Sequence, residues 1–200
     1  FDFSKCFSDW FYTTFSASGS RQNRSFCMIR EEETEKGGRR FDVSAALRVL
    51  RDHRGDEYRP DGHFLGDRIC AHAANRLARN AMQSTGSLVA HLKSDEHTFW
   101  ATGTSGPCTG IFKPVWFGPR PLPDIGPTPG GSFHPDALWW YHERLHRGVL
   151  LDYSTRIDAY REERDAMEGG FRENADNAGP DERTTLTQEA FTRSREATER

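Results

Sequence analysis

A change of hydrophobic period in the middle of the chain constrains the fold most. Residues 88–92 alternate between apolar and more polar side chains, residues 93–97 form a polar turn, and residues 98–104 are rich in aromatic and hydroxyl side chains. Such patterns are typical of strands. Residues 109–117 predict a third strand, with Pro114 at a sheet edge or a strand end, because proline cannot donate a backbone hydrogen bond. The pattern predicts an antiparallel meander.

Two helical patterns precede the meander. Asp42 predicts the N-cap of a helix that begins at Val43. Near the N-terminus, aromatic side chains recur at helical spacing, and a stripe of this density needs a partner surface. Its members are Phe3, Phe7, Trp10, Phe11 and Phe15.

Two further helices are expected after the meander. Ser132 is a candidate cap for a helix over residues 135–148, which has a bulky apolar face. A second helix is expected over residues 153–168, where acidic and basic residues alternate as on a solvated face, and the glycine pair at 169 and 170 ends or weakens it. The sequence therefore predicts an α+β chain.

Composition favours one globular domain with a polar tail. The 200 residues are 35% hydrophobic and 28% charged, which suits a single domain of this length. Much of the polarity lies in the last forty residues, which contain a break at residues 176–180. We expect one domain over residues 1–175 and a polar helical tail over residues 176–200.

Charge and hydropathy exclude two classes of partner. The net charge of -3 gives no reason to expect nucleic acid, because phosphate binding needs a clustered basic surface. No run of about 18 apolar residues could span a membrane, and the first residues lack the pattern of a signal peptide. We therefore expect a cytoplasmic chain with no membrane partner.

Cysteine and histidine spacing predicts no metal and no cofactor. The four cysteines form no Cys-x-x-Cys pair, which favours free thiols in a reducing compartment. The acidic and histidine residues between 52 and 67 match no known ligand spacing. The prediction of no metal extends to His142 and His146, although one helical turn between histidines is a geometry that can chelate.

Small hydroxyl residues and histidines at the strand ends are the candidate lining of a polar substrate pocket. Each has an ordinary alternative: a solvent-facing strand histidine, or plain strand propensity for the threonines. Cys70 and His72 could form a thiolate and base, but two residues apart on a strand they favour a buried structural cysteine, so no catalytic residue is assigned. The pocket candidates are His72, Thr85, Ser87, His91, Thr102 and Thr104.

Several separated motifs resemble the secernin and cysteine dipeptidase family. Two upstream segments, FYTTF at residues 11–15 and LRDH at residues 50–53, are similar to the helical region that precedes those motifs. The motifs are ICAHA at residues 69–73, QSTGSLVAHL at 83–92, WATGT at 100–104 with Pro107-Cys108, and IFKPV at 111–115.

The resemblance implies part of an N-terminal-nucleophile hydrolase, an αββα sandwich of two antiparallel sheets between helix layers. In that family an N-terminal cysteine attacks an amide carbonyl, and its own α-amino group is the general base. The first residue here is Phe1, and Cys6 cannot replace the nucleophile because five residues precede it. We expect a C-terminal fragment whose nucleophile lies on a missing N-terminal half of the same protein.

Two functions therefore remain open. The leading one is part of a cysteine dipeptidase or amidohydrolase that acts on a small peptide substrate. The alternative is a noncatalytic interaction or scaffold protein of the same fold, which uses the aromatic stripe and the C-terminal helices as contact surfaces. The exposed stripe would also favour self-association into a homo-oligomer.

Overall fold

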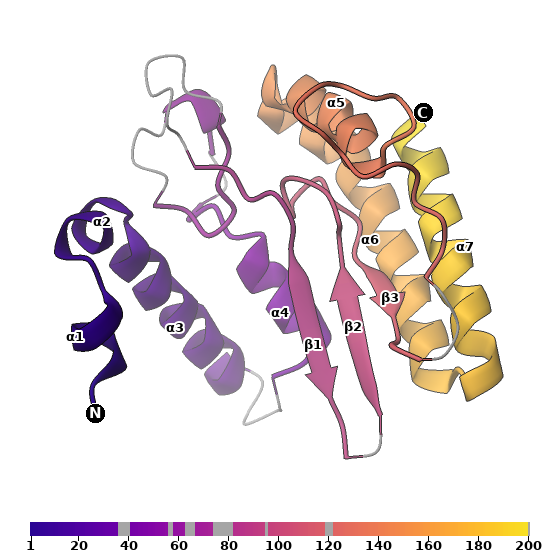
Figure 1. Ribbon diagram of the computed structural model, residues 1–200, viewed down its shortest axis with the longest axis horizontal. Helices are drawn as coiled ribbons and strands as arrows, with labels where there is room; N and C mark the ends of the chain where they lie inside the picture. The colour runs from indigo at the N-terminus through magenta and orange to yellow at the C-terminus, as the bar shows by residue number, and fades with distance from the viewer. Residues whose placement is uncertain are drawn as a thin grey trace. The chain divides into compact units, whose positions relative to one another are not determined.

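The computed structural model divides the chain into two compact units, residues 1–83 and residues 84–200 (Figure 1). Within the part of the chain that is described, no helix is both long and apolar enough to cross a membrane. The described residues are 1–35, 41–55, 58–62, 67–73, 82–94, 96–118 and 122–199.

The regular elements described in unit 1, residues 1–83, are all helices. Its elements are α1 (Phe3–Phe7), α2 (Trp10–Phe15), α3 (Ser18–Glu35), α4 (Val43–Leu50) and the short 3-10 helix η1 (Pro60–Gly62). The predicted cap of α4 is confirmed, because the Asp42 carboxylate accepts a hydrogen bond from the backbone N–H of Ala45 at 2.7 Å. The helix buries Ala45, Leu47 and Val49.

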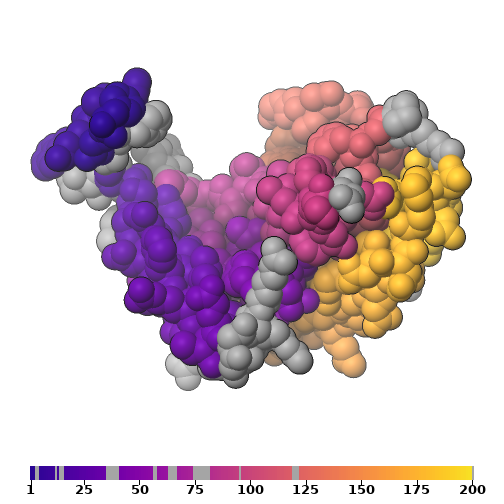
Figure 2. Space-filling view, turned by 90° about the horizontal axis from the view of Figure 1, so that it is seen from below, coloured from indigo at the N-terminus to yellow at the C-terminus, as the bar shows by residue number. Residues whose placement is uncertain are grey.

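The residues of the N-terminal aromatic stripe belong to α1 and α2, the first helices of unit 1 (Figure 2, indigo). Phe7, Trp10 and Phe11 are all exposed, and Trp10 is exposed over 77% of its surface. Large exposed aromatic groups mark a surface that could bind a partner.

Unit 2, residues 84–200, contains the predicted antiparallel meander. Strands β1 (Leu88–Leu92), β2 (His97–Ala101) and β3 (Lys113–Val115) form one sheet in the order β1-β2-β3. Ala90 is the partner of Phe99, and Trp100 is the partner of Pro114. Pro114 is thus on an edge strand of this sheet, as predicted.

Strands β2 and β3 are shorter than the sequence pattern suggests. Residues 102–112 form a loop instead, in which Gly103 and Gly106 have positive φ angles of 63° and 65°. A side chain at Gly106 would also collide with His146, because an added Cβ would lie 2.9 Å from its Cδ2. This loop therefore depends on glycine at position 106.

Three helices follow the sheet: α5 (Leu138–Leu150), α6 (Tyr153–Asn177) and α7 (Pro180–Glu199). Helices α6 and α7 pack against β3 (Figure 1). Thr187 on α7 donates a hydrogen bond to the backbone carbonyl of Pro114 at 3.0 Å. The residues expected to form a polar tail are thus helical and contact the sheet.

Two predicted helix boundaries are wrong and one is confirmed. Helix α5 begins three residues later than residue 135, and its N-cap is Ala137 rather than Ser132. The glycine pair at 169 and 170 does not end α6, since the adjacent Phe171 is fully buried and holds the helix in place. The predicted break falls between Asn177 and Pro180, as expected.

The α+β class is confirmed by this mixture of helices and one small antiparallel sheet. Only this three-stranded sheet is found among the described residues. The two-sheet αββα sandwich therefore stays a prediction.

Candidate functional site

The six predicted pocket residues fall in different units. His72 belongs to unit 1. The other five belong to unit 2 and are Thr85, Ser87, His91, Thr102 and Thr104.

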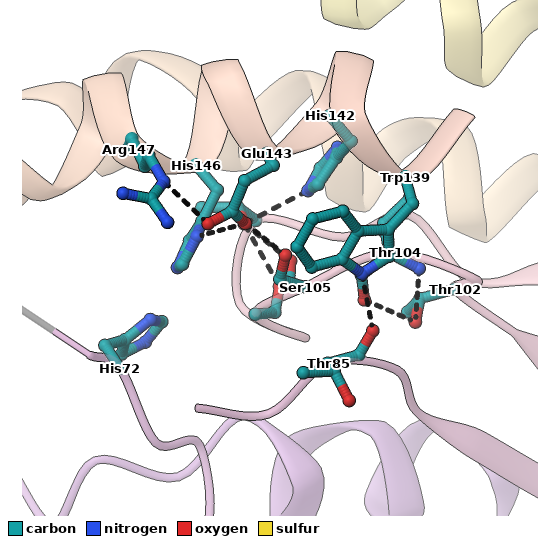
Figure 3. Close-up of polar contacts among 12 residues, drawn as sticks. His72, Thr85, Thr102, Thr104, Ser105, Trp139, His142, Glu143, His146 and Arg147 are labelled. Atoms are coloured by element: carbon teal, nitrogen blue, oxygen red, sulfur yellow. Dashed lines mark hydrogen bonds and ion pairs between the residues drawn. The ribbon is translucent and has the colours of Figure 1, made fainter. Parts of the chain in front are cut away.

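Thr102 is the centre of the predicted residues in unit 2 (Figure 3). Its fully buried hydroxyl accepts a hydrogen bond from the backbone N–H of Ser87 at 3.0 Å and donates to the carbonyl of Thr104 at 3.2 Å. The Thr102 N–H donates to the Ser87 carbonyl at 3.0 Å, and the Gly106 N–H donates to the Ser84 carbonyl at 2.8 Å. These bonds fix the segment before β1 to the loop after β2.

Thr85 and His91 do not join this hydrogen-bonded group through their side chains. The Thr85 carbonyl accepts a bond from Trp139 Nε1 at 3.1 Å, whereas its residue as a whole is exposed (Figure 3). His91 is the cross-strand partner of Thr98, four positions along the strand from Ser87, a separation of roughly 13 Å in extended chain. Ser87, Thr102 and Thr104 therefore form a hydrogen-bonded wall, which Thr85 and His91 do not extend into a converging pocket.

A buried carboxylate that the sequence analysis did not select lies on α5 beside this wall. Glu143 accepts a hydrogen bond from the hydroxyl of Ser105, contacts His146 Nδ1 at 3.1 Å, and accepts from Arg147 Nε at 2.8 Å (Figure 3). Ser105, Glu143 and His146 are all buried, while the Arg147 side chain is 71% exposed. The carboxylate faces a nitrogen or a hydroxyl group in each of these three contacts.

The signal for this network was present in the sequence. Residues 142–146 read His-Glu-Arg-Leu-His, the H-E-x-x-H pattern of zinc protease helices, and the prediction that set the histidine pair aside overlooked Glu143. The two histidines do not converge as they do on a zinc protease helix. His142 Nε2 lies 3.3 Å from Thr109 Oγ1, and His146 contacts Glu143. Neither histidine belongs to the group of described residues that could hold a metal ion.

Burial keeps His142 neutral. The pKa of His142 is lowered from 6.5 to about 3, mainly by desolvation and also by the nearby charges of Lys113 and His146, against the opposing charge of Glu143. A neutral imidazole can exchange one hydrogen bond with Thr109 without carrying a charge into the core. The motif thus supports packing between α5 and the loop at residues 102–112.

Lys113 is a second buried ionisable group of unit 2. Its ammonium donates to the carbonyls of Thr102 and Ile111 at 2.8 and 2.7 Å, and burial lowers its pKa from 10.5 to about 7, partly opposed by the charge of Glu168. Glu168 on α6 in turn accepts the backbone N–H of Phe112 at 2.7 Å. These bonds connect the edge strand to the loop and to α6.

Unit 1 holds a cluster of a different kind. His53 Nε2 lies 3.0 Å from His72 Nε2, and Cys70 Sγ lies 3.3 Å from the same His72 nitrogen. Cys70 and His72 are buried, and the ring of Tyr58 stacks on His53 at 4.1 Å between centroids. The prediction that Cys70 and His72 lie on a strand is wrong, since residues 67–73 are outside any strand.

A pocket of unit 2 lies apart from all the predicted residues. It measures about 320 Å³ and is lined by the end of β3 and the start of α7, including Trp116, Phe117 and Arg183. The Arg183 guanidinium lies over the Trp116 ring and pairs with Glu96. The pocket lining thus combines aromatic rings with a guanidinium that stacks on one of them and is paired with a carboxylate.

No protein-family model, curated protein or solved structure matches the chain. The resemblance to secernins and cysteine dipeptidases therefore depends on the motifs alone.

Proposed function

We propose that unit 2 forms the sheet and pocket wall of a secernin-like cysteine dipeptidase or amidohydrolase, which cleaves peptide-type amide bonds. In this proposal the nucleophile is an N-terminal cysteine supplied from outside residues 1–200. The observation that carries it is the interlocking of the family-like segments at residues 84–87 and 100–108 through Thr102 and Gly106.

The wall has the properties that a hydrolase site requires. Hydrolases hold the first layer of the site in place by a second layer of hydrogen bonds, because small displacements are costly for the reaction rate. Here the buried Thr102 hydroxyl makes contacts with both neighbouring segments. The buried Thr104 hydroxyl has no hydrogen-bond partner within the described residues, as is common for groups kept for function.

The test is a peptidase assay on the protein made from the complete reading frame, with a panel of dipeptides. We expect hydrolysis that iodoacetamide blocks and that a Cys→Ser change at the mature N-terminus abolishes. Within this chain, Thr102→Val should lower kcat/KM by roughly tenfold or more, because the wall loses its shared hydroxyl. Thr98→Val, at the other end of β2, is the matched control and should leave kcat/KM close to that of the parent.

Two results would contradict the enzyme proposal. One is a folded product of the complete reading frame that cleaves no dipeptide. The other is hydrolysis that persists after the Cys→Ser change, because the family mechanism requires that thiolate.

The exposed aromatic stripe favours a second candidate function, a noncatalytic interaction protein. Phe7, Trp10 and Phe11 present apolar surface in unit 1, and such patches mark partner surfaces. If this function holds, Trp10→Ser should reduce self-association or partner binding in light scattering and leave any peptidase activity unchanged. An identical scattering mass for parent and variant over a concentration series would remove this candidate.

A further inference from the structure

We infer that His53, Cys70 and His72 bind one Zn²⁺ ion in unit 1. The inference concerns a site that the peptidase proposal does not use, and it stands or falls independently of that proposal. It is carried by the convergence of two imidazole nitrogens and one sulfur from two separate segments of the chain.

The distances fit a shared metal ion. The three donor atoms all lie within 4.8 Å of one another, with 3.0 Å between the two Nε2 atoms and 3.3 Å from Cys70 Sγ to His72 Nε2. Ordinary Zn–N and Zn–S bond lengths in a tetrahedron place two nitrogens about 3.4 Å apart and a nitrogen and a sulfur about 3.6 Å apart. Each of the two close pairs thus needs to separate by only a few tenths of an ångström to hold the ion, and the third pair, His53 Nε2 and Cys70 Sγ, lies within 4.8 Å.

Hydrogen bonding alone explains the cluster poorly. An imidazole nitrogen offers either one N–H or one lone pair in the ring plane. His72 Nε2 has two close polar neighbours, His53 Nε2 and Cys70 Sγ, and can form a good bond to one of them only. A cation between the three groups removes this conflict, because each group then directs its lone pair at the ion.

Surrounding contacts already hold the donors in place. The ring of Tyr58 stacks on His53 with 3° between the planes. The Cys70 N–H donates to the carbonyl of Asp52 at 3.1 Å, which places the cysteine beside the residue that precedes His53. Arg24 binds the Asp52 carboxylate with two hydrogen bonds of 3.0 and 2.7 Å. Such supporting contacts are typical of metal sites, where they orient the ligands.

The donor set selects the metal. Thiolate and imidazole suit Zn²⁺, whereas Mg²⁺ and Ca²⁺ require oxygen ligands. Cys70 is fully buried and His72 nearly so, and a buried thiol in this position is protected from bulk oxidants and water. The three donors occupy three of the four positions of a tetrahedral zinc ion.

The first experiment uses the whole chain and the metal alone. The chain is purified under reducing conditions, stripped with a chelator, and titrated with Zn²⁺ in competition with a chromophoric chelator. We expect one Zn²⁺ per chain. Co²⁺ substitution should give a thiolate-to-metal charge-transfer band, and X-ray absorption of the zinc form should show one sulfur at about 2.3 Å and nitrogens at about 2.0 Å. These readouts need no variant, so they do not depend on whether a variant folds.

Variants then assign the ligands. Cys70→Ser should abolish the charge-transfer band, and His72→Asn should weaken Zn²⁺ binding by at least about 100-fold, since even supporting residues cost 10 to 100-fold. Cys27→Ser and His97→Asn change exposed residues of the same types and should bind Zn²⁺ as tightly as the parent chain.

Either of two results would overturn the site. One is the absence of stoichiometric Zn²⁺ after titration of the reduced, folded chain. The other is a Cys70→Ser chain that keeps the parent spectrum with Co²⁺, which would place the sulfur ligand elsewhere. Because no peptide is used, a failed peptidase assay has no bearing on either result.

Discussion

The polar clusters of the two units differ in how their charges and lone pairs are matched. In unit 2, the buried carboxylates of Glu143 and Glu168 have hydrogen-bonding partners. Glu143 contacts Ser105, His146 and Arg147, and Glu168 accepts a hydrogen bond from a backbone N–H. In unit 1, the Nε2 atom of His72 has two close neighbours that, like it, can donate electron pairs to a metal: His53 Nε2 and Cys70 Sγ. The first arrangement pairs carboxylates with hydrogen-bond donors, whereas the second brings three metal-ligating atoms within 4.8 Å of one another. Buried polar groups alone therefore do not identify a binding site; the balance of donors and acceptors does.

The largest expected effect tests whether the unit 2 network is structural. Glu143→Ala leaves buried Ser105 and His146 without their acceptor, so it should lower the free energy of unfolding by roughly 3–5 kcal/mol. Urea unfolding followed by tryptophan fluorescence measures this change, because four of the five tryptophans lie in unit 2. Glu162→Ala, an exposed acidic position on α6, is the control and should change stability by less than about 0.5 kcal/mol. A loss no larger than that of the control would mean that the network contributes little to folding.

The second effect tests the loop that carries Ser105 against α5. Gly106→Ala introduces a Cβ at 2.9 Å from His146 Cδ2 and forces a positive φ on alanine. Backbone strain and overpacking together should cost about 2–4 kcal/mol in the same urea experiment. Gly131→Ala has open space and an ordinary φ, so it serves as the control. Equal stability of the two variants would contradict the close approach of this loop to α5.

Local signals were enough to predict several elements of the fold. The alternation at residues 88–92, the edge position of Pro114 and the cap at Asp42 each depend on one segment and its backbone chemistry. Tertiary packing decided the rest. Phe171 is buried beside the glycine pair at 169 and 170, and this burial outweighs the weak helix propensity of glycine.

The candidate sites were less accessible from the sequence. Thr102 could be selected because a hydroxyl at a strand end is conspicuous, but its role in joining two loops depends on the fold. Glu143 belongs to the H-E-x-x-H pattern at residues 142–146, but the prediction from sequence did not include it. The meeting of His53 with His72 joins positions 19 residues apart through irregular backbone, for which no periodicity exists. Sequence spacing predicts metal ligands only when they share one turn or one helix.

The third prediction compares how Zn²⁺ changes the local stability of the two units, and it rests on the proposed site in unit 1. Zn²⁺ at 100 times its dissociation constant should stabilise the folded form of the site by about 2.7 kcal/mol, because the ion binds the folded state. Hydrogen exchange measures this as slower exchange of amides in α4 and residues 67–73. Amides of β1 and β2 in unit 2 should exchange as before, and so should all amides of Cys70→Ser. Equal slowing in both units would contradict a site confined to unit 1.

The smallest effect concerns Lys113, the buried lysine of unit 2. It tests whether the hydrogen bonds of its ammonium fully offset the cost of burying the charge. The pKa of Lys113 falls from 10.5 to about 7 on folding, mainly because burial disfavours its charge. Between these values the unfolded chain binds more protons than the folded chain, so stability rises with pH, and the contribution is lost as pH falls through 7. We expect a gain of about 1 kcal/mol from pH 7 to pH 8, measured by urea unfolding at each pH.

Lys113→Met deprives the carbonyls of Thr102 and Ile111 of their donor, so its overall stability can change, but the rise with pH should disappear. Lys93→Met removes an exposed ammonium and should keep the rise. If Lys113→Met kept it as well, the charge of Lys113 would be as well solvated in the folded unit as in the unfolded chain, and the contrast between the two units would lose one of its supports.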